Sequence, residues 1–342
     1  MAYPGVVEDL HTCARLGVPS RVPVFALGEE FDVEMCGADY RRYIRRPELM
    51  VDCQVRAVER FDYDWILLHP DDYIELEPLG IETVVDERMP PAAVRTLPAD
   101  RETLTKLRIP DPARAGRMPA HLEALGGIKS VFGDRLVVAG RVAAPFSAVA
   151  LLYGIRDGLL LLYDDPELFQ ATAEFCVELM TAWGIAQLDA GADAIWLGDC
   201  VAASGFLSPQ QHADFALEPA ARVSDNLRTH GGVVIYHGGD ASLPHLKLQA
   251  PHFEVINVGE GCDLAEIKAA IGEQVCLSGN AHPIALMNCD DLAEVGEETA
   301  RIVEAGKPGG GYIFNTGEGI ARQTPPDVVE TMIQTAKRCG QY

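Results

Sequence analysis

Short apolar runs, each ending in a polar or charged residue, recur along the second half of the chain. They are Asp193–Asp199, Val233–His237, Phe253–Asn257, Gln274–Asn280 and Gly311–Asn315. Three further apolar runs precede them, at Val22–Leu27, Trp65–His69 and Leu136–Val142. Helix-like segments separate the runs, and this alternation is typical of a parallel sheet buried on both faces. Eight such strands suit a TIM-type barrel, so the pattern predicts an α/β fold with a single (β/α)8 barrel.

The intervening helices carry start and stop signals. Asp165-Pro166-Glu167 combines an N-cap, a proline in the first turn and an acidic residue, and Asp189–Gly191 ends that helix. Ser208-Pro209 begins another helix, which ends near His230. Asp290 or Asp291 caps a helix running to about Ala305, with Gly306 as its stop.

The pattern is interrupted at residues 84–116, which are rich in proline and include Pro90-Pro91. We interpret them as an excursion from the barrel, made of surface loop and a short helix. Residues 1–20 and 38–60 look like extra N-terminal helices packed outside the barrel. No linker divides the chain, so residues 1–342 are predicted to form one domain.

The net charge and the cysteine content limit the possible partners and the cellular location of the protein. The net charge of −23 over 342 residues argues against nucleic acid and anionic membranes as partners. The longest apolar stretch is far too short to cross a bilayer, and no signal-peptide pattern is visible at the N-terminus. Nine cysteines without a C-x-x-C pair favour a reducing, cytoplasmic location. A homodimer is compatible with the sequence, because dimers are the commonest soluble oligomers.

Candidate functional residues follow the strands, whose carboxyl ends meet at the mouth of a barrel. Asp71, with Asp72 beside it, could act as a base at that mouth, and either could instead cap a helix. Asp199 could orient a ligand or substrate, and Cys200 could bind a metal as a thiolate. Asn280 and Glu260 are weaker candidates.

His237 and Glu318 are the strongest candidates. His237 ends a strand and is followed by two glycines, which let the backbone approach a ligand. Glu318 lies between glycines in the loop after Asn315, where its charge disfavours a phosphate. Together with one of Asp199, Cys200, Asp240 or His282 they would form a zinc site. The spacing alone is not a specific metal signature.

Several motifs resemble the uroporphyrinogen decarboxylase superfamily, which includes zinc-dependent, corrinoid-linked methyltransferases. The resemblance runs from about Val22 to the C-terminus. It is carried by residues 191–209, 277–283 and 315–326, and residues 162–168 look like the methyltransferase branch. It implies a distorted TIM barrel with its active site at the carboxyl ends of the strands.

Individual positions indicate which branch of the superfamily the chain resembles. The decarboxylases hold substrate carboxylates with arginines after the first strand, but here Leu27–Asp32 is acidic and lacks arginine. Their catalytic aspartate corresponds to Asp71, their tyrosine to Leu151 and their histidine to Glu318. The methyltransferases bind zinc through His-x-Cys and a later cysteine, which here are His237, Gly239 and Glu318. One carboxylate in place of two thiolates would make the zinc a stronger Lewis acid.

The resemblance therefore favours a methyltransferase that moves a methyl group from a small donor, for example a methoxyaromatic compound, to the cobalt of a corrinoid protein. Zinc would be held by His237 and Glu318, with Cys200 or His282 as further ligands. Asp71, Asp199 and Glu318 are the catalytic candidates, and Glu30, Asn280 and Asn315 the substrate-binding ones. Two alternatives stay open: a metal-independent decarboxylase that uses Asp71, and a non-catalytic binding barrel.

Overall fold

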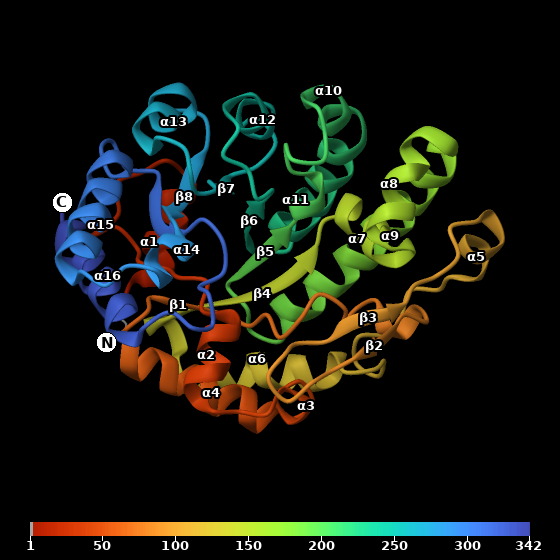
Figure 1. The fold of residues 1–342 in the computed structure, drawn as a ribbon, viewed down its shortest axis with the longest axis horizontal. Helices are drawn as coiled ribbons and strands as arrows, with labels where there is room; N and C mark the ends of the chain where they lie inside the picture. The colour runs from red at the N-terminus through yellow and green to blue at the C-terminus, as the bar shows by residue number, and fades with distance from the viewer. Residues whose placement is uncertain (1–2) are drawn as a thin grey trace.

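A parallel sheet curls into a barrel at the centre of the protein (Figure 1). The computed structural model describes residues 3–342. Seven strands follow one another in the order β1, β4, β5, β6, β7, β8, β9, and all neighbours are parallel. Their bounds are β1 Trp65–Leu67, β4 Val137–Ala143, β5 Ala194–Gly198, β6 Val233–His237, β7 Val255–Asn257, β8 Cys276–Ala281 and β9 Tyr312–Thr316. The predicted TIM-type α/β fold is confirmed.

The remaining predicted strand, Val22–Leu27, comes first in the chain and closes the barrel through only a few hydrogen bonds. Val24 forms an isolated parallel bridge with Phe314 of β9, and its carbonyl accepts from the backbone of Asp64 at 3.0 Å. Pro23 has no N–H to donate, and the N–H of Val24 donates to the Asp64 carboxylate instead of a strand. A regular ladder therefore cannot form here, although the segment fills the gap between β9 and β1.

Helices surround the barrel (Figure 1). The outer helices are α4 Pro47–Phe61, α6 Met118–Phe132, α9 Pro166–Asp189, α11 Glu218–Thr229, α12 Leu243–Gln249, α13 Leu264–Ile271, α15 Leu292–Gly306 and α16 Pro326–Cys339. Shorter helices lie in the connections: α2 Glu29–Cys36, α3 Tyr40–Tyr43, α7 Pro145–Tyr153, α8 Ile155–Asp164, α10 Pro209–His212 and α14 Pro283–Met287. Single 3-10 turns occupy Glu77–Leu79, Gly133–Arg135 and Cys200–Ala202.

The predicted helix signals are confirmed with one refinement. Asp165 and Asp291 cap α9 and α15 by accepting from Leu168 and Ala293. Ser208 begins α10 with a complete capping box. The predicted helix from Ser208 to His230 is interrupted by a π-helical turn at Ala213–Leu217 before α11. Pro219 in the first turn of α11 cannot donate a backbone hydrogen bond, which accounts for the wider turn.

A hairpin that the sequence did not predict lies at the start of the excursion at residues 84–116. β2 (Glu82–Val84) pairs with β3 (Ala92–Arg95) in antiparallel fashion, and α5 (Arg101–Lys106) is the expected short helix. The hairpin strands are mostly exposed and only three and four residues long, so period-2 analysis, which needs alternation over about 4–8 residues, could not detect them.

The N-terminal helix differs in place from the expectation. α1 (Val6–Ala14) does not lie outside the barrel wall, because Val6, Leu10 and Cys13 pack into the cluster that fills the barrel interior. Cys13 donates from its thiol to the carbonyl of Tyr312 in β9. Residues 1 and 2 of the predicted N-terminal segment lie outside the described residues.

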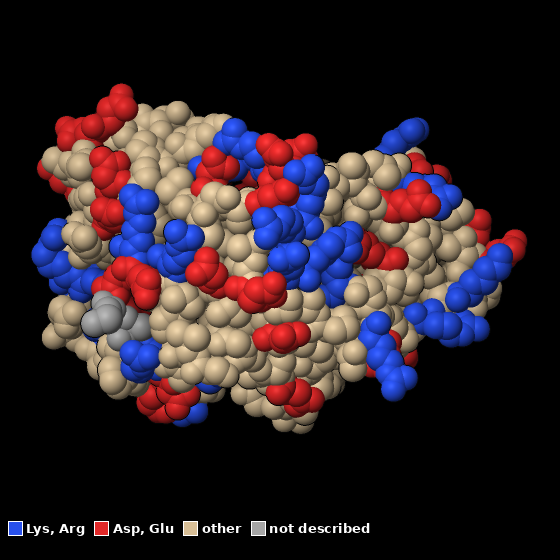
Figure 2. All heavy atoms as spheres, turned by 90° about the horizontal axis from the view of Figure 1, so that it is seen from below, with Lys and Arg blue, Asp and Glu red and all other residues tan. Residues whose placement is uncertain are grey.

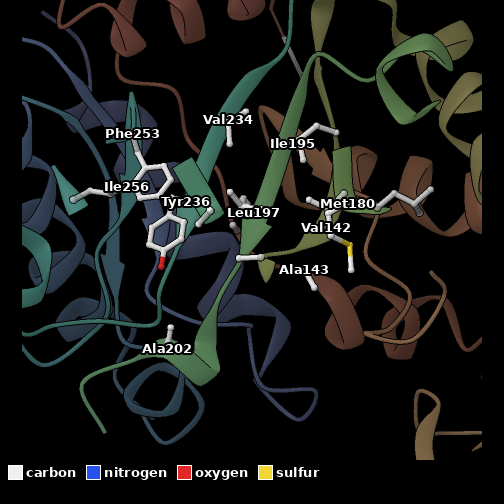
Figure 3. Packing of buried hydrophobic residues seen from close by; sticks show 14 of the residues in the cluster. Val142, Ala143, Met180, Ile195, Leu197, Ala202, Val234, Tyr236, Phe253 and Ile256 are labelled. Atoms are coloured by element: carbon white, nitrogen blue, oxygen red, sulfur yellow. The ribbon is translucent and has the colours of Figure 1, made fainter. Parts of the chain in front are cut away.

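Strand alternation divides the apolar residues between two cores. Val233 and Ile235 of β6 face the barrel interior, while Val234 and Tyr236 face the surrounding helices. Figure 3 shows this outer layer, where the rings of Tyr236 and Phe253 stack with centroids 4.0 Å apart. Side chains therefore fill the barrel interior. The functional residues are expected at the carboxyl ends of the strands, which we call the upper end of the barrel.

Charged residues of both signs share the surface. Figure 2 shows Lys and Arg interspersed with Asp and Glu on the face that it displays. In residues 3–342 no single helix is long and apolar enough to cross a membrane, and α7 with α8 reaches that length only as a pair bent by 109°.

Candidate metal centre and active site

The interior side chains change from apolar to polar at the carboxyl ends of four strands. Because successive inward residues are two positions apart, each polar residue lies directly above an apolar one. The pairs are His237 above Ile235, Asn257 above Val255, Ser278 above Cys276, and Asn315 above Ile313. The strand endings that stand out in the sequence are thus a polar layer at the top of the barrel.

Three candidate ligands meet above this layer. Single ligand atoms of Cys200, His237 and Glu318 all lie within 4.8 Å of one another. His237 Nε2 is 3.3 Å from Glu318 Oε1. We call these residues the ligand triad, and they are the only such set among residues 3–342. His237 ends β6, whereas Cys200 and Glu318 follow β5 and β9, so the barrel itself brings them together.

The triad is closed on one side and open on the other. The His237 side chain is only 4% exposed, and its ring stacks on Trp196 with centroids 4.7 Å apart. Cys200 is exposed, and the Glu318 side chain is 42% exposed. A rigid imidazole below two accessible ligands resembles a catalytic metal site, which keeps a position open for substrate.

The charges of the triad favour a bound cation. Burial lowers the pKa of His237, but Cys200 and Glu318 outweigh it and hold that pKa well above the ordinary value. Burial raises the pKa of Glu318, yet the hydrogen bond and charge of His237 bring it below the ordinary value. An imidazole nitrogen, a thiol sulfur and a carboxylate oxygen are all zinc ligands, so the residues fit this ion.

Gly239 gives the triad its space. It has φ +62°, and a Cβ built on it would lie 3.1 Å from Glu318 Oε1 and 3.9 Å from the Cβ of Cys200. Position 239 therefore points into the triad. The methyltransferase pattern has a cysteine at this position, and Cys200 on the neighbouring loop lies beside it.

Asp199 supports the triad without joining it. Its buried carboxylate accepts from Ser147 Oγ at 2.7 Å and from Tyr236 Oη at 2.9 Å. Burial raises the pKa of Asp199 to about 6, partly offset by these hydrogen bonds and by His237. Asp199 thus fixes the loop on which Cys200 lies, which is a positioning role.

The structure does not bring Asp71 into the mouth as expected. Arg117 donates to both of its carboxylate oxygens, at 2.6 and 2.9 Å, and both side chains are buried. Arg117 also donates to Glu77 at 2.9 Å. Arg117 lies just beyond the proline-rich excursion, and no sequence signal linked it to Asp71. The Asp71 side chain is 0% exposed and both oxygens already accept from Arg117, so the carboxylate does not face a substrate in the mouth.

A second charged network at the mouth was missed from the sequence. His69 lies 3.2 Å from Glu29 through Nδ1 and 3.3 Å from Asp72 through Nε2. Arg141, buried in β4, contacts Asp72 and Glu75. Burial lowers the pKa of His69, but Asp72 and then Glu29 raise it overall to about 10. His69 was hidden by its position before Pro70, within the predicted strand.

This network makes the stability of the protein depend on pH. The folded-state pKa of His69 lies above the unfolded value of about 6.5, so its stabilisation is complete below that pH and disappears as pH rises through about 10. The free energy of unfolding, measured with urea, should therefore fall more between pH 6.5 and 10.5 in the wild type than in His69→Asn. Equal losses in the two proteins would contradict this.

The predicted substrate-binding residues are not part of the triad. Glu30 is half-buried beside Glu29, and burial followed by the charge of Glu29 raises its pKa. Asn280 donates to the carbonyls of Gly259 and Cys262, and Asn315 donates to Ser278. Both asparagines thus hold the upper rim of the barrel together, whereas Glu30 remains accessible.

His282 is separate from the triad, contrary to its predicted place as a metal ligand. It is exposed at the start of α14 and lines a cavity of about 670 Å³ between α14, α15 and the loop after β7. Asp240 and Glu260 are also outside the triad, and Asp240 accepts from the backbone of Ser204. Of the four candidates for a third ligand, Cys200 is the one whose ligand atom lies close to His237 and Glu318.

Asn257 is a site residue that sequence reasoning missed. Its Nδ2 lies 3.2 Å from His237 Nδ1 and 3.0 Å from the carbonyl oxygen of Gly317, next to Glu318. Its position at the end of the apolar run Phe253–Asn257, level with His237 at the end of its own run, was the available signal.

Comparisons with known proteins agree on family and fold. The uroporphyrinogen decarboxylase (URO-D) family matches residues 8–339. The chain is 29% identical to the uroporphyrinogen decarboxylase of Roseiflexus sp. (strain RS-1) over 85% of both chains. It is 24% identical to that of Neisseria meningitidis, over 85% of this chain and 83% of the other.

The fold is also that of a methyltransferase from Methanosarcina mazei, with a TM-score of 0.87 and 20% identity over 98% of this chain and 99% of the other. At this identity the likeness concerns the fold alone. The family match, by contrast, spans nearly the whole chain, including all three residues of the ligand triad. The protein therefore belongs to the uroporphyrinogen decarboxylase family.

Proposed function

We propose that the protein is a zinc-dependent methyltransferase, which moves a methyl group from a small donor to the cobalt of a corrinoid carried by a separate protein. The observation that carries this proposal is the convergence of Cys200, His237 and Glu318 at the open end of the barrel. Zinc bound there would act as a Lewis acid on the heteroatom that bears the methyl group. The extensive fold match to a protein named a methyltransferase supports this branch.

Each part of the chain has a role in this proposal. His237, fixed between Trp196 and Asn257, would hold the ion from below. Cys200 and Glu318 would complete the site from two exposed loops, which leaves the upper side to the donor. The methyl group must leave in that direction, so the corrinoid protein would dock over the barrel mouth. An O-methyl donor, such as a methoxyaromatic compound, suits a site with only one thiolate.

The charges at the mouth disfavour the decarboxylase alternative. Glu30 and Glu318 add negative charge at the opening, while Glu29 and Asp72 are paired with His69 and Arg141. The two buried arginines, Arg117 and Arg141, are already paired with carboxylates and are not free to bind a substrate. A substrate with many carboxylates would be repelled, at about 1–4 kcal/mol for each unit charge pair near 4 Å. The pairing of Asp71 with Arg117 also argues against Asp71 as the acid–base group. A non-catalytic barrel would have no need of three converging ligands.

Metal analysis with transfer assays tests the proposal. The wild type should bind about one zinc per chain and methylate cob(I)alamin from a methoxyaromatic donor, as followed by the cobalamin spectrum. His237→Ala and Glu318→Gln should no longer bind zinc, and their methyl-transfer rates should fall at least about 100-fold. Each substitution removes a metal ligand, which has a larger effect than the loss of a supporting partner. A wild type without zinc, together with full methyl transfer by both variants, would refute the mechanism. A chelator-resistant decarboxylation would favour the lyase instead.

A further inference from the structure

The amide of Asn257 contacts two parts of the ligand triad from inside the barrel. Asn257 ends β7 and is 1% exposed. Its Nδ2 lies 3.2 Å from Nδ1 of His237 and donates to the carbonyl of Gly317 at 3.0 Å. Gly317 directly precedes Glu318, so one amide connects the imidazole ligand to the loop of the carboxylate ligand.

The other end of this amide is unsatisfied. Oδ1 of Asn257 is buried and has no hydrogen-bond partner among residues 3–342. Leaving such an oxygen unpaired costs about 1–3 kcal/mol, and an unpaired group of this kind in a native protein requires an explanation. Asn315, in the same polar layer, uses both ends of its amide, on Ser278 and Thr316. The unpaired oxygen thus belongs to the asparagine that faces His237.

The position of the hydrogen on His237 explains the unpaired oxygen. Nδ1 of His237 faces Asn257 Nδ2, and Nε2 faces Glu318. An ion on Nε2 needs the lone pair of that nitrogen, so the hydrogen must then be on Nδ1. Nδ1–H and the amide NH2 would then be two donors facing each other. Turning the amide by half a turn brings Oδ1 to Nδ1 and resolves the conflict.

We propose that Asn257 is a positioning residue that selects which nitrogen of His237 carries the hydrogen. With an ion on Nε2, its amide presents Oδ1 to the Nδ1–H of the ring. The same rotation replaces the donor to the Gly317 carbonyl by the acceptor Oδ1, and because two oxygens repel each other, the loop that carries Glu318 must shift when the ion binds. This inference rests on the proposed function, because it assumes an ion on Nε2.

Two variants of nearly equal size separate this role from a purely structural one. Asn257→Asp and Asn257→Leu both lack the donor to Gly317, but only the aspartate can accept from Nδ1–H. Zinc affinity, measured by competition with a chromophoric chelator, should fall about 10–100-fold in Asn257→Leu. Asn257→Asp should bind zinc at least as tightly as the wild type. The visible spectrum of the cobalt(II)-substituted aspartate variant should keep the wild-type bands.

Gln54→Leu provides a matched control. Gln54 is a buried amide on α4 that donates to Tyr43, so its loss should leave zinc affinity unchanged. If both Asn257 variants weaken zinc equally, the amide only ties down the Gly317 carbonyl and the inference is wrong, while the zinc site stands. Wild-type affinity in Asn257→Leu would also overturn it. A wild type that binds no zinc would overturn the proposed function as well.

Discussion

Replacing Arg117 by methionine is expected to destabilise the protein by about 3–5 kcal/mol, because the buried carboxylate of Asp71 would lose its partner. The side chains of Arg117 and Asp71 are only 4% and 0% exposed. The guanidinium donates to both oxygens of Asp71 and to Glu77. Burial lowers the pKa of Arg117, but Asp71 and Glu77 raise it overall, so the guanidinium keeps its charge. Urea unfolding of the wild type and Arg117→Met measures the loss.

The double variant Asp71→Asn/Arg117→Met tests the cause of this loss. Without the buried charge, it should regain a large part of the stability lost in Arg117→Met, since replacing both members of a buried pair is tolerated better than removing one. Arg114→Met is the control, because Arg114 is exposed and 3.7 Å from Asp111, where a change within about 0.5 kcal/mol is expected. A loss below about 1 kcal/mol in Arg117→Met would show that Asp71 does not need this partner.

The Asp71–Arg117 pair shows what could not be predicted from the sequence. The alternation of apolar strands and helices identified all seven strands of the barrel sheet and the segment that closes it, but not the hairpin strands β2 and β3, because periodicity is a local property of the chain. It also placed Asp71 after β1, but not the direction of its side chain. That direction is set by Arg117, 46 residues later, and a contact across a proline-rich excursion has no local signature.

The ligand triad was predictable in part. His237, Glu318 and Cys200 were all candidates, because each follows a strand whose carboxyl end must reach the barrel mouth. Choosing Cys200 over His282 required the lateral position of each loop around the barrel, which strand order alone does not give. Asn257 was not identified, since an asparagine that ends an apolar run looks the same whether it points inward or caps a turn.

Moving the thiol of the triad from position 200 to position 239 should largely restore a site that Cys200→Ser has disabled. Cys200→Ser alone is expected to weaken zinc binding by more than the 10–100-fold typical of a lost supporting partner, because it removes a ligand. A Cβ at Gly239 would lie 3.1 Å from Glu318 Oε1 and 3.9 Å from the Cβ of Cys200. A cysteine there would therefore extend into the space that the native thiol occupies.

The recovery in Cys200→Ser/Gly239→Cys should be incomplete. Gly239 has φ +62°, and a side chain in this left-handed region costs about 1–2 kcal/mol of folding stability, so the backbone that carries the new thiol is expected to shift. Thiolate-to-cobalt charge-transfer absorption in the cobalt(II)-substituted proteins should vanish in the single variant and return in the double one. Gly239→Ala in the Cys200→Ser background is the control, because it adds the backbone strain without the thiol. If the double variant binds zinc no better than this control, Cys200 does not occupy the place of the missing cysteine, and the triad is not the site of a thiolate-bound ion.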